Sequence, residues 1–304
     1  MTFPLLRALQ AAIAFGLCIA AAPAQEKPLV RSFTDGSVET YKVALTLRVD
    51  VRDVSTQTVG QKTYVKPVSH NAEVTFAWTS RRRIVSVSPD GTAQIEETAT
   101  PVSAECATNP AAEPGAQKLQ SSLEEVCSRL RADQTLRYEE EPSGLIHDLP
   151  SDAALTFGED APPLLALWLR RNLRPSVIFP ALPFRAGARS QRPVHSRNMV
   201  GSETAEWADS TANSCATLHV VQELSWPEPA AKSGLSNVGG TPAGETTFFA
   251  DSSSNLSLLD GAVIDSTRTA SRETKRILHS VDGLPQPPEF SSKLTVVVRV
   301  RRVS

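Results

Sequence analysis

The sequence has few aromatic residues, few cysteines and almost no excess of one charge. Of its 304 residues, 6% are aromatic and four are cysteine, while 31 basic residues oppose 33 acidic ones for a net charge of −2. A small disulfide-stapled scaffold needs more cysteines, a disordered tail needs a larger net charge, and a nucleic-acid-binding domain needs a basic surface. These three classes are excluded, and no nucleic acid is expected as a partner. The low aromatic content also argues against the aromatic girdles of an outer-membrane barrel.

Motifs that carry chemistry are lacking as well. The sequence contains no G-x-S-x-G elbow, H-E-x-x-H helix, Walker loop or G-x-G-x-x-G fingerprint. Its five histidines are scattered singly, without the spacing of metal ligands, so we expect no metal site and no cofactor. His147 is the one histidine next to a carboxylate, and it falls at a predicted hairpin end. The sequence favours a non-catalytic protein; the alternative is a hydrolase whose site assembles from distant residues around His147, His195 or His219.

The N-terminus carries one apolar run. Arg7 precedes a stretch from Ala8 to Ala21 that only Gln10 interrupts, and Ala22-Pro23-Ala24 follows with small residues where a signal peptidase reads them. The run is shorter than the roughly 20 residues that span a bilayer. Residues 1–24 therefore predict a signal peptide cut after Ala24, a periplasmic or secreted protein with a net charge of −3, and no transmembrane span after cleavage.

Three cysteines remain after this cleavage: Cys106, Cys127 and Cys215. An exported protein folds in an oxidising compartment, where cysteines pair. Cys106 and Cys127 flank one local segment and are the candidate disulfide, which would stabilise the fold by roughly 3 kcal/mol in the loop-entropy model. Cys215 lies in an apolar run and is interpreted as a buried thiol.

Alternation of apolar and polar residues dominates the rest of the chain. It is clearest from Tyr41 to Val51 and from Phe290 to Val300, and it predicts strands with one buried and one solvated face. Hairpin turns are predicted at Pro89-Asp90-Gly91, at Pro142-Ser143-Gly144 and at Asp260-Gly261. The 57 Ser and Thr residues suit the wet faces and turns of such strands. Antiparallel pairing follows, because parallel strands would need helical crossovers.

Two segments instead repeat their apolar residues every three or four positions, as helices do. The first is Gln117 to Arg131. The second runs from Pro162 to Arg174 and carries Leu165, Trp168 and Leu169 on one face. These three side chains are either ordinary core contacts or contacts to an apolar ligand, the helix then acting as a plug or lid over a groove that holds an acyl chain.

The predicted fold is mainly β: a large curved antiparallel sheet, a half-barrel or open barrel-like form, with one or two short packing helices. Residues 25–304 are expected to form a single large β-rich domain with a helical or loop insertion at about 99–131 and a helix at about 162–174. The alternative is two β subdomains split near 150–190.

The sequence also contains two runs of like charge. Arg81-Arg82-Arg83 is the densest positive cluster, and Glu139-Glu140-Glu141 is a comparable acidic run. The arginines are interpreted as an anion site or, more conservatively, as a solvated strand end. If the acidic run opposes them across strands, both runs are structural.

The segment Pro180–Gly187, the pair Phe248-Phe249, the Asp260-Gly261 hairpin and the final strand from Lys293 to Val303 resemble uncharacterised exported bacterial β-rich proteins. The overall plan is similar to the half-barrel of periplasmic lipoprotein and lipid carriers. The resemblance implies non-catalytic binding of an apolar ligand such as a lipid, or of an envelope protein, and it assigns no site residues. A structural or protein-interaction module of the cell envelope is the alternative.

Overall fold

The computed structural model describes residues 28–59, 62–109, 134–147, 172–196, 199–208, 215–227, 244–277 and 289–303. These ranges contain eleven β-strands. In chain order they are β1 (Val38–Val59), β2 (Lys62–Val87), β3 (Ala93–Asn109), β4 (Gln134–Glu140), β5 (Ile146–His147), β6 (Arg189–Ser196), β7 (Met199–Ala208), β8 (Cys215–Pro227), β9 (Gly244–Ser257), β10 (Val263–Ile277) and β11 (Glu289–Arg302).

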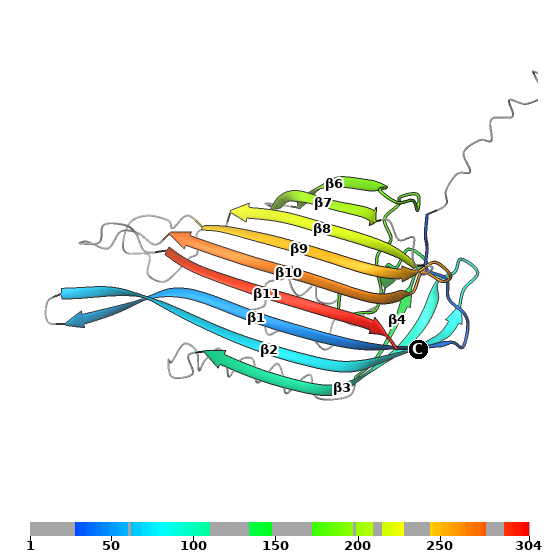
Figure 1. Ribbon diagram of the computed structural model, residues 1–304, viewed down its shortest axis with the longest axis horizontal. Helices are drawn as coiled ribbons and strands as arrows, with labels where there is room; N and C mark the ends of the chain where they lie inside the picture. Colours follow the sequence, from blue (N-terminus) through cyan, green and yellow to red (C-terminus); the bar gives the residue numbers. More distant parts are fainter. Residues whose placement is uncertain are drawn as a thin grey trace, which may run out of the picture.

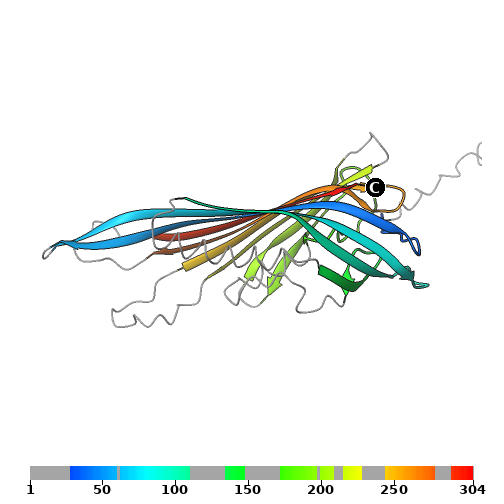
Figure 2. The ribbon, with the colours of Figure 1, turned by 90° about the horizontal axis from the view of Figure 1, so that it is seen from below.

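All eleven strands lie in one antiparallel sheet (Figure 1), in the order β5-β4-β3-β2-β1-β11-β10-β9-β8-β7-β6. Strands that follow one another in sequence pair with each other, with the exception of β5 and β6, and one further pair joins strands far apart in the sequence. β5 and β6 lie at opposite edges of the sheet, and β1 and β11 pair at its centre, with Tyr41 opposite Arg302. The sheet is open and curved (Figure 2). The predicted fold class, a large curved antiparallel sheet, is confirmed.

The predicted alternation places apolar side chains on one face, which we call the inner face. On β1, Val43, Leu45 and Leu47 are each at most 3% exposed. Lys42, which precedes them, and Arg48, which follows them, are exposed on the outer face. Side chains of one face recur every second residue of a strand. Register therefore carries the inner face across β2 and β11, where it continues through Val74, Phe76, Trp78, Val296, Val298 and Val300.

The apolar core continues beyond the centre of the sheet onto β7, β8 and β9. Trp207, Leu218 and Phe248 belong to the same buried cluster as the β1 residues. Between these two apolar regions, small buried side chains line β9 and β10, and we call them the small-residue strip. They are Ala250, Ser254, Ser266 and Ala270.

The segment Asn172–Arg185, which we call the strap, packs against the inner face. Leu173 and Phe179 of the strap are buried in the core cluster, and Phe184 packs edge-on against Trp207 with ring centroids 5.2 Å apart. The Phe179 N–H donates a hydrogen bond of 2.9 Å to the carbonyl of Ser143 in the β4–β5 turn. The strap is thus fixed to both the face and one end of the sheet.

The three predicted hairpin turns all contain a glycine with positive φ: Gly91 (88°), Gly144 (77°) and Gly261 (66°). Glycine adopts this conformation without the steric cost that other residues meet. At Gly144 the strap adds a second constraint, because a Cβ atom there would lie 1.8 Å from the Val177 carbonyl oxygen. This turn can hold the strap closely only because it has no side chain.

Gly144→Ala is therefore expected to destabilise the protein more than the same change at Gly36. Both glycines have similar φ values, 77° and 73°, but nothing lies within 4 Å of a Cβ at Gly36. Gly36→Ala should lower the free energy of unfolding by about 1–2 kcal/mol, the cost of the left-handed backbone. Gly144→Ala should cost about 1–3 kcal/mol more, because the strap must move. Urea unfolding of the two variants measures the difference, and equal costs would contradict the close packing of the strap.

Beyond the main sheet, β1 and β2 continue as a two-stranded ribbon (Figure 1). Arg52 is the last β1 residue paired with β11, and from Asp53 to Val59 the described partners of β1 lie on β2 alone. An isolated pair of strands is marginally stable in water, so the stability of the two strands comes from their part inside the sheet.

The structure differs from the sequence-based boundaries in two places. β3 continues to Asn109 and pairs with β2 along this length, so residues 99–109 are strand and not part of the predicted insertion. β6 and β7 were not predicted individually, because few aliphatic residues mark their inner face. The predicted helix over 117–131 and most of the helix over 162–174 lie outside the described residues. Within those described, no helix is long and apolar enough to cross a membrane.

Candidate functional site

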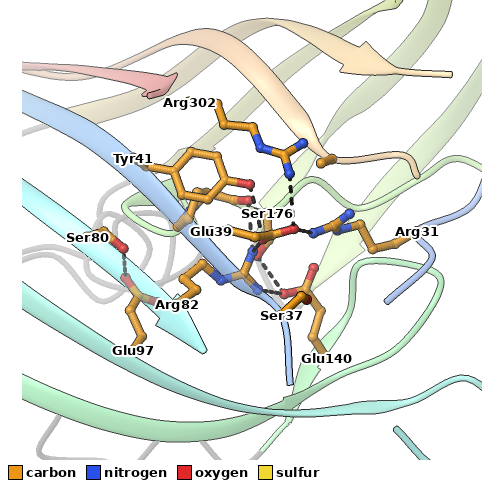
Figure 3. Close-up of polar contacts among 12 residues, drawn as sticks. Arg31, Ser37, Glu39, Tyr41, Ser80, Arg82, Glu97, Glu140, Ser176 and Arg302 are labelled. Carbon is orange, nitrogen blue, oxygen red and sulfur yellow. Dashed lines mark hydrogen bonds and ion pairs between the residues drawn. The ribbon is translucent and has the colours of Figure 1, made fainter. Parts of the chain in front are cut away.

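A cluster of charged side chains is buried at the end of the inner face where β1 begins and β2 ends (Figure 3). We call it the ionic cluster. Its arginines come from the segment before β1, from β2 and from the strap, and its carboxylates from β1, β3 and β4. Its members are Arg31, Glu39, Arg82, Glu97, Glu140 and Arg174.

Strand alternation places two of these charges inside. Glu39 precedes Tyr41 by two residues, and Arg82 follows Ser80 by two residues, so each shares the inner face with its buried neighbour. Glu39 and Arg82 face one another across the β1–β2 pair, and both are at most 5% exposed. A buried charge is tolerated only when it is paired and hydrogen-bonded.

Arg82 is the centre of the cluster. Its Nη1 lies 3.3 Å from Glu39 Oε2, and its Nη2 contacts Glu140 Oε2. Its Nε donates a 3.0 Å hydrogen bond to Tyr138 Oη, and Nη1 also donates to the Pro175 carbonyl of the strap at 3.3 Å. Burial would lower the pKa of Arg82, but Glu140 and its other neighbours hold it well above its usual value. Arg82 is therefore a fixed cation that joins three strands to the strap.

Glu97 on β3 provides a second point of attachment. Ser80 Oγ and Tyr138 Oη each donate a 2.7 Å hydrogen bond to its carboxylate, and Arg174 Nη1 of the strap lies 3.2 Å away. Burial would raise the pKa of Glu97, but Arg174, Arg82 and the two hydroxyl groups lower it below the usual value. The ionised form of Glu97 holds the strap to the sheet.

Glu39 has a comparable environment. It contacts Arg31, accepts a 3.2 Å hydrogen bond from Tyr41 Oη, and lies 3.8 Å from Arg302 Nη2. Burial opposes ionisation of Glu39, yet Arg82 and Arg31 lower its pKa. Burial of Tyr41 and the nearby charge of Glu39 raise the pKa of the Tyr41 hydroxyl, which therefore keeps its proton and donates it to the hydrogen bond.

Glu140 differs from the other two carboxylates. It contacts Arg82 and accepts a 3.0 Å hydrogen bond from Ser176 Oγ of the strap. Its burial is nevertheless the largest influence and raises its pKa above the usual value, with Glu39 adding in the same direction. Glu140 is thus the member of the cluster that accepts a proton most readily.

Arg268 on β10 forms a separate anchor for the strap. Its Nη1 donates hydrogen bonds to the carbonyls of Asn172 (2.8 Å) and Arg174 (2.9 Å), and its Nη2 donates to that of Ser176 (2.8 Å). Its Nε donates to Ser266 Oγ at 2.9 Å. Burial lowers the pKa of Arg268 to about 10. One guanidinium thus binds the carbonyls of three alternate residues at the start of the strap.

A shallow groove of about 420 Å³ crosses β7, β8 and β9. The side chains around it that belong to the outer face include Val200 and Phe249, which are 53% and 41% exposed. The carboxylate of Glu223 lies on the same face, opposite Phe249. This groove is apart from the ionic cluster and contains no cluster of titratable groups.

The predicted site residues fall mainly beyond what the structure describes. Leu165, Trp168, Leu169 and Cys127 lie outside the described residues. The backbone of Cys106 lies on β3, opposite Val74 of β2. Because Cys127 is outside the described residues, the Cys106–Cys127 disulfide stays a prediction. Cys215, predicted to be buried, is half-buried at the start of β8.

The two charge runs are divided between the faces of the sheet. Arg82 of the first run pairs with Glu140 of the second in the buried cluster, whereas Arg81 and Arg83 are exposed on the outer face. The two runs do not oppose one another directly, because β3 lies between β2 and β4. His147 contacts Glu141 at 2.6 Å on the surface of the β4–β5 turn. In the part of the chain that the structure describes, no three His, Cys, Asp or Glu side chains form a metal site.

The fold places the chain among mainly-β proteins built on one open antiparallel sheet. No protein-family model matches the sequence, and no curated protein matches it. Its function is therefore inferred from the geometry of the inner face and the strap.

Proposed function

We propose that the protein binds an apolar ligand, an acyl chain being the simplest, between the inner face and the strap. The observation that carries this proposal is the composition of the inner face. Apolar side chains of β1, β2 and β11 lie on one side of the small-residue strip, and Leu218 and Trp207 lie on the other. Ligand sites are mostly apolar surfaces with a few polar groups at defined positions, and Arg268 is such a group on the strip.

The strap supports the same function because its attachment is uneven. Residues 172–179 are fixed by the ionic cluster and by Arg268. Farther along, Ala181, Pro183 and Arg185 are exposed. In this structure the inner face is filled, since Ala270 and Val296 are fully buried. An incoming ligand would therefore displace apolar cover while the polar anchors stay in place.

The location that we propose for this activity is the periplasm or the exterior of the cell, following the signal peptide predicted over residues 1–24. The resemblance to exported β-rich proteins, and to the half-barrels of lipid carriers, supports the same environment. A carrier of acyl chains needs no catalytic residues, which agrees with the lack of catalytic motifs in the sequence.

Native mass spectrometry of gently purified protein tests the proposal. We expect a copurified lipid, and an at least tenfold loss of it in Ala270→Phe, which adds a ring to the small-residue strip. Thr269→Phe is the matched control, because Thr269 is the neighbouring β10 residue on the outer face. If Ala270→Phe fails to fold, the smaller change Ala250→Val replaces it. Absence of lipid together with no binding of a fluorescent acyl probe would show that the carrier function is wrong.

A structural or protein-interaction module of the envelope is the second candidate, and the filled inner face favours it. It predicts protein without lipid and one envelope protein cross-linked reproducibly in cells. The hydrolase has no such support among the described residues. His147, His195 and His219 are exposed and lie on β5, β6 and β8, so they do not converge on one cleft.

A further inference from the structure

Exposed positive charge is concentrated at one end of the outer face. The basic side chains come from three adjacent central strands, β2, β1 and β11, and we call them the basic patch. They are Lys42, Arg81, Arg83, Arg299 and Arg301. None of the five makes an ion pair within the described chain, although the whole protein has a net negative charge.

The strand register holds two of these cations against each other. Lys42 lies directly opposite Arg301 in the β1–β11 pair. Side chains so placed have Cβ atoms about 4.5–5.5 Å apart, and like charges there destabilise a sheet. The stability of the fold therefore does not account for this pair, and an external anion would relieve its repulsion.

Two acids lie directly opposite residues of the basic patch in the strand register, and both have other partners. Glu96 lies opposite Arg83, but it forms a 2.8 Å ion pair with Arg137. Asp265 lies opposite Arg301, where it accepts a 3.0 Å hydrogen bond from Asn255. The five cations of the patch and the two acids directly opposite them leave an excess of three positive charges.

The other end of the outer face has mixed charge. Arg48 forms a 3.0 Å ion pair with Asp50, and Lys275 lies 3.3 Å from Glu273. Lys293 lies opposite Asp50 on one side and opposite Glu273 on the other. At this end of the outer face, each of these cations therefore has an acidic neighbour. The unpaired positive charge is found at the other end, in the basic patch.

Exposed valines accompany the basic residues. Val38, Val85 and Val303 are 43%, 44% and 53% exposed. Val38 lies opposite Arg83, and Thr40 lies opposite Arg81. The Val303 N–H donates a 2.9 Å hydrogen bond to the Thr40 carbonyl, which holds Val303 close to these arginines. Cations interleaved with apolar side chains are the composition of surfaces that bind at a lipid interface.

We propose that the basic patch docks the protein on an anionic lipid bilayer. The charge complementarity is with a layer of phosphate headgroups, to which each Lys or Arg near the surface contributes attraction. The five cations are spread over three adjacent strands of an open sheet face, so a continuous layer of anions fits them better than one shaped ligand does. The site lies on the opposite face from the proposed ligand site and does not depend on it.

Flotation with lipid vesicles tests the docking surface. The sample is the protein as it is purified from the cells that produce it. The two compositions are phosphatidylcholine alone and phosphatidylcholine with about one third phosphatidylglycerol. The test variant is Arg81→Gln/Arg83→Gln/Arg301→Gln. The matched control, Arg48→Gln/Lys275→Gln/Lys293→Gln, removes the same number of cations from the other end of the same face. Thermal melts establish that both variants are folded.

We expect binding to the anionic vesicles only, a decrease of this binding as salt rises, and an at least tenfold weaker partition of the test variant. The control variant should bind as the unaltered protein does. Equal binding to both vesicle types, equal losses in the two variants, or no binding at all would each overturn the proposal. Binding to polyglutamate but not to vesicles would assign the surface to an acidic protein and overturn it too. Copurified lipid on the inner face is a separate readout, so either proposal can fail alone.

Discussion

Replacing Arg82 by Met is expected to lower the free energy of unfolding by about 3–5 kcal/mol, the range for removing one partner of a buried ion pair. The side chain is fully buried and contacts Glu39 and Glu140. Glu140 has no other cation in contact among the described residues, so the variant would leave its carboxylate buried and uncompensated. Urea unfolding at neutral pH, followed by circular dichroism, measures the loss.

Two further variants separate this effect from a general loss of charge. Arg81→Met removes a cation from the adjacent, exposed position and should change the stability by less than about 0.5 kcal/mol. The double variant Arg82→Met/Glu140→Gln should recover part of the loss, because the carboxylate that lacked a partner is then neutral. A cost in Arg82→Met no larger than in Arg81→Met would contradict the role of the ionic cluster.

Replacing Arg268 by Met should cost about 2–4 kcal/mol, because it removes the donors for three buried carbonyls at once. These carbonyls belong to Asn172, Arg174 and Ser176. The strap should also open locally, so its amides should exchange with solvent faster than those of the central strands. Urea unfolding and hydrogen exchange measured by mass spectrometry report the two effects separately.

Arg268→Lys serves as the graded variant, since one ammonium cannot reproduce the planar fork that reaches all three carbonyls. The free energy of unfolding of Arg268→Lys should lie between those of Arg268→Met and the unaltered protein. Arg299→Met on the outer face is the control and should change stability by less than about 0.5 kcal/mol. If strap amides exchange no faster in Arg268→Met than in this control, Arg268 does not anchor the strap.

The architecture of the sheet could be predicted because its central strands have strong contrast between faces. The alternation from Tyr41 to Val51 indicates β1, and that from Phe290 to Val300 indicates β11, and both strands are present. The glycine turns at Gly91 and Gly261 follow from local chemistry, since only glycine adopts positive φ at little cost. The pairing of β1 with β11 could not be predicted, because alternation specifies which residues share a face and not which strand lies alongside.

Two charged residues of the ionic cluster stand out in the sequence itself. Glu39 and Arg82 fall in the apolar phase of their strands, and a charged residue in a buried phase indicates either a buried pair or a functional site. Arg268 left no such signal. Its neighbours on the inner face of β10 are Ser266 and Ala270, which contrast little with Thr267 and Thr269 on the other face.

The central position of β1 determines when the sheet can be completed. β1 has β2 as an immediate hairpin partner, but its other edge pairs with β11, and Tyr41 meets Arg302 from the far end of the described chain. Contacts between residues so distant in sequence form slowly, and an unpaired edge can recruit other chains until they do. Because synthesis begins at the N-terminus, β1 has one long unpaired edge until β11 has been made. We therefore expect its biogenesis to depend on an escort that shields β1 until the last strand arrives.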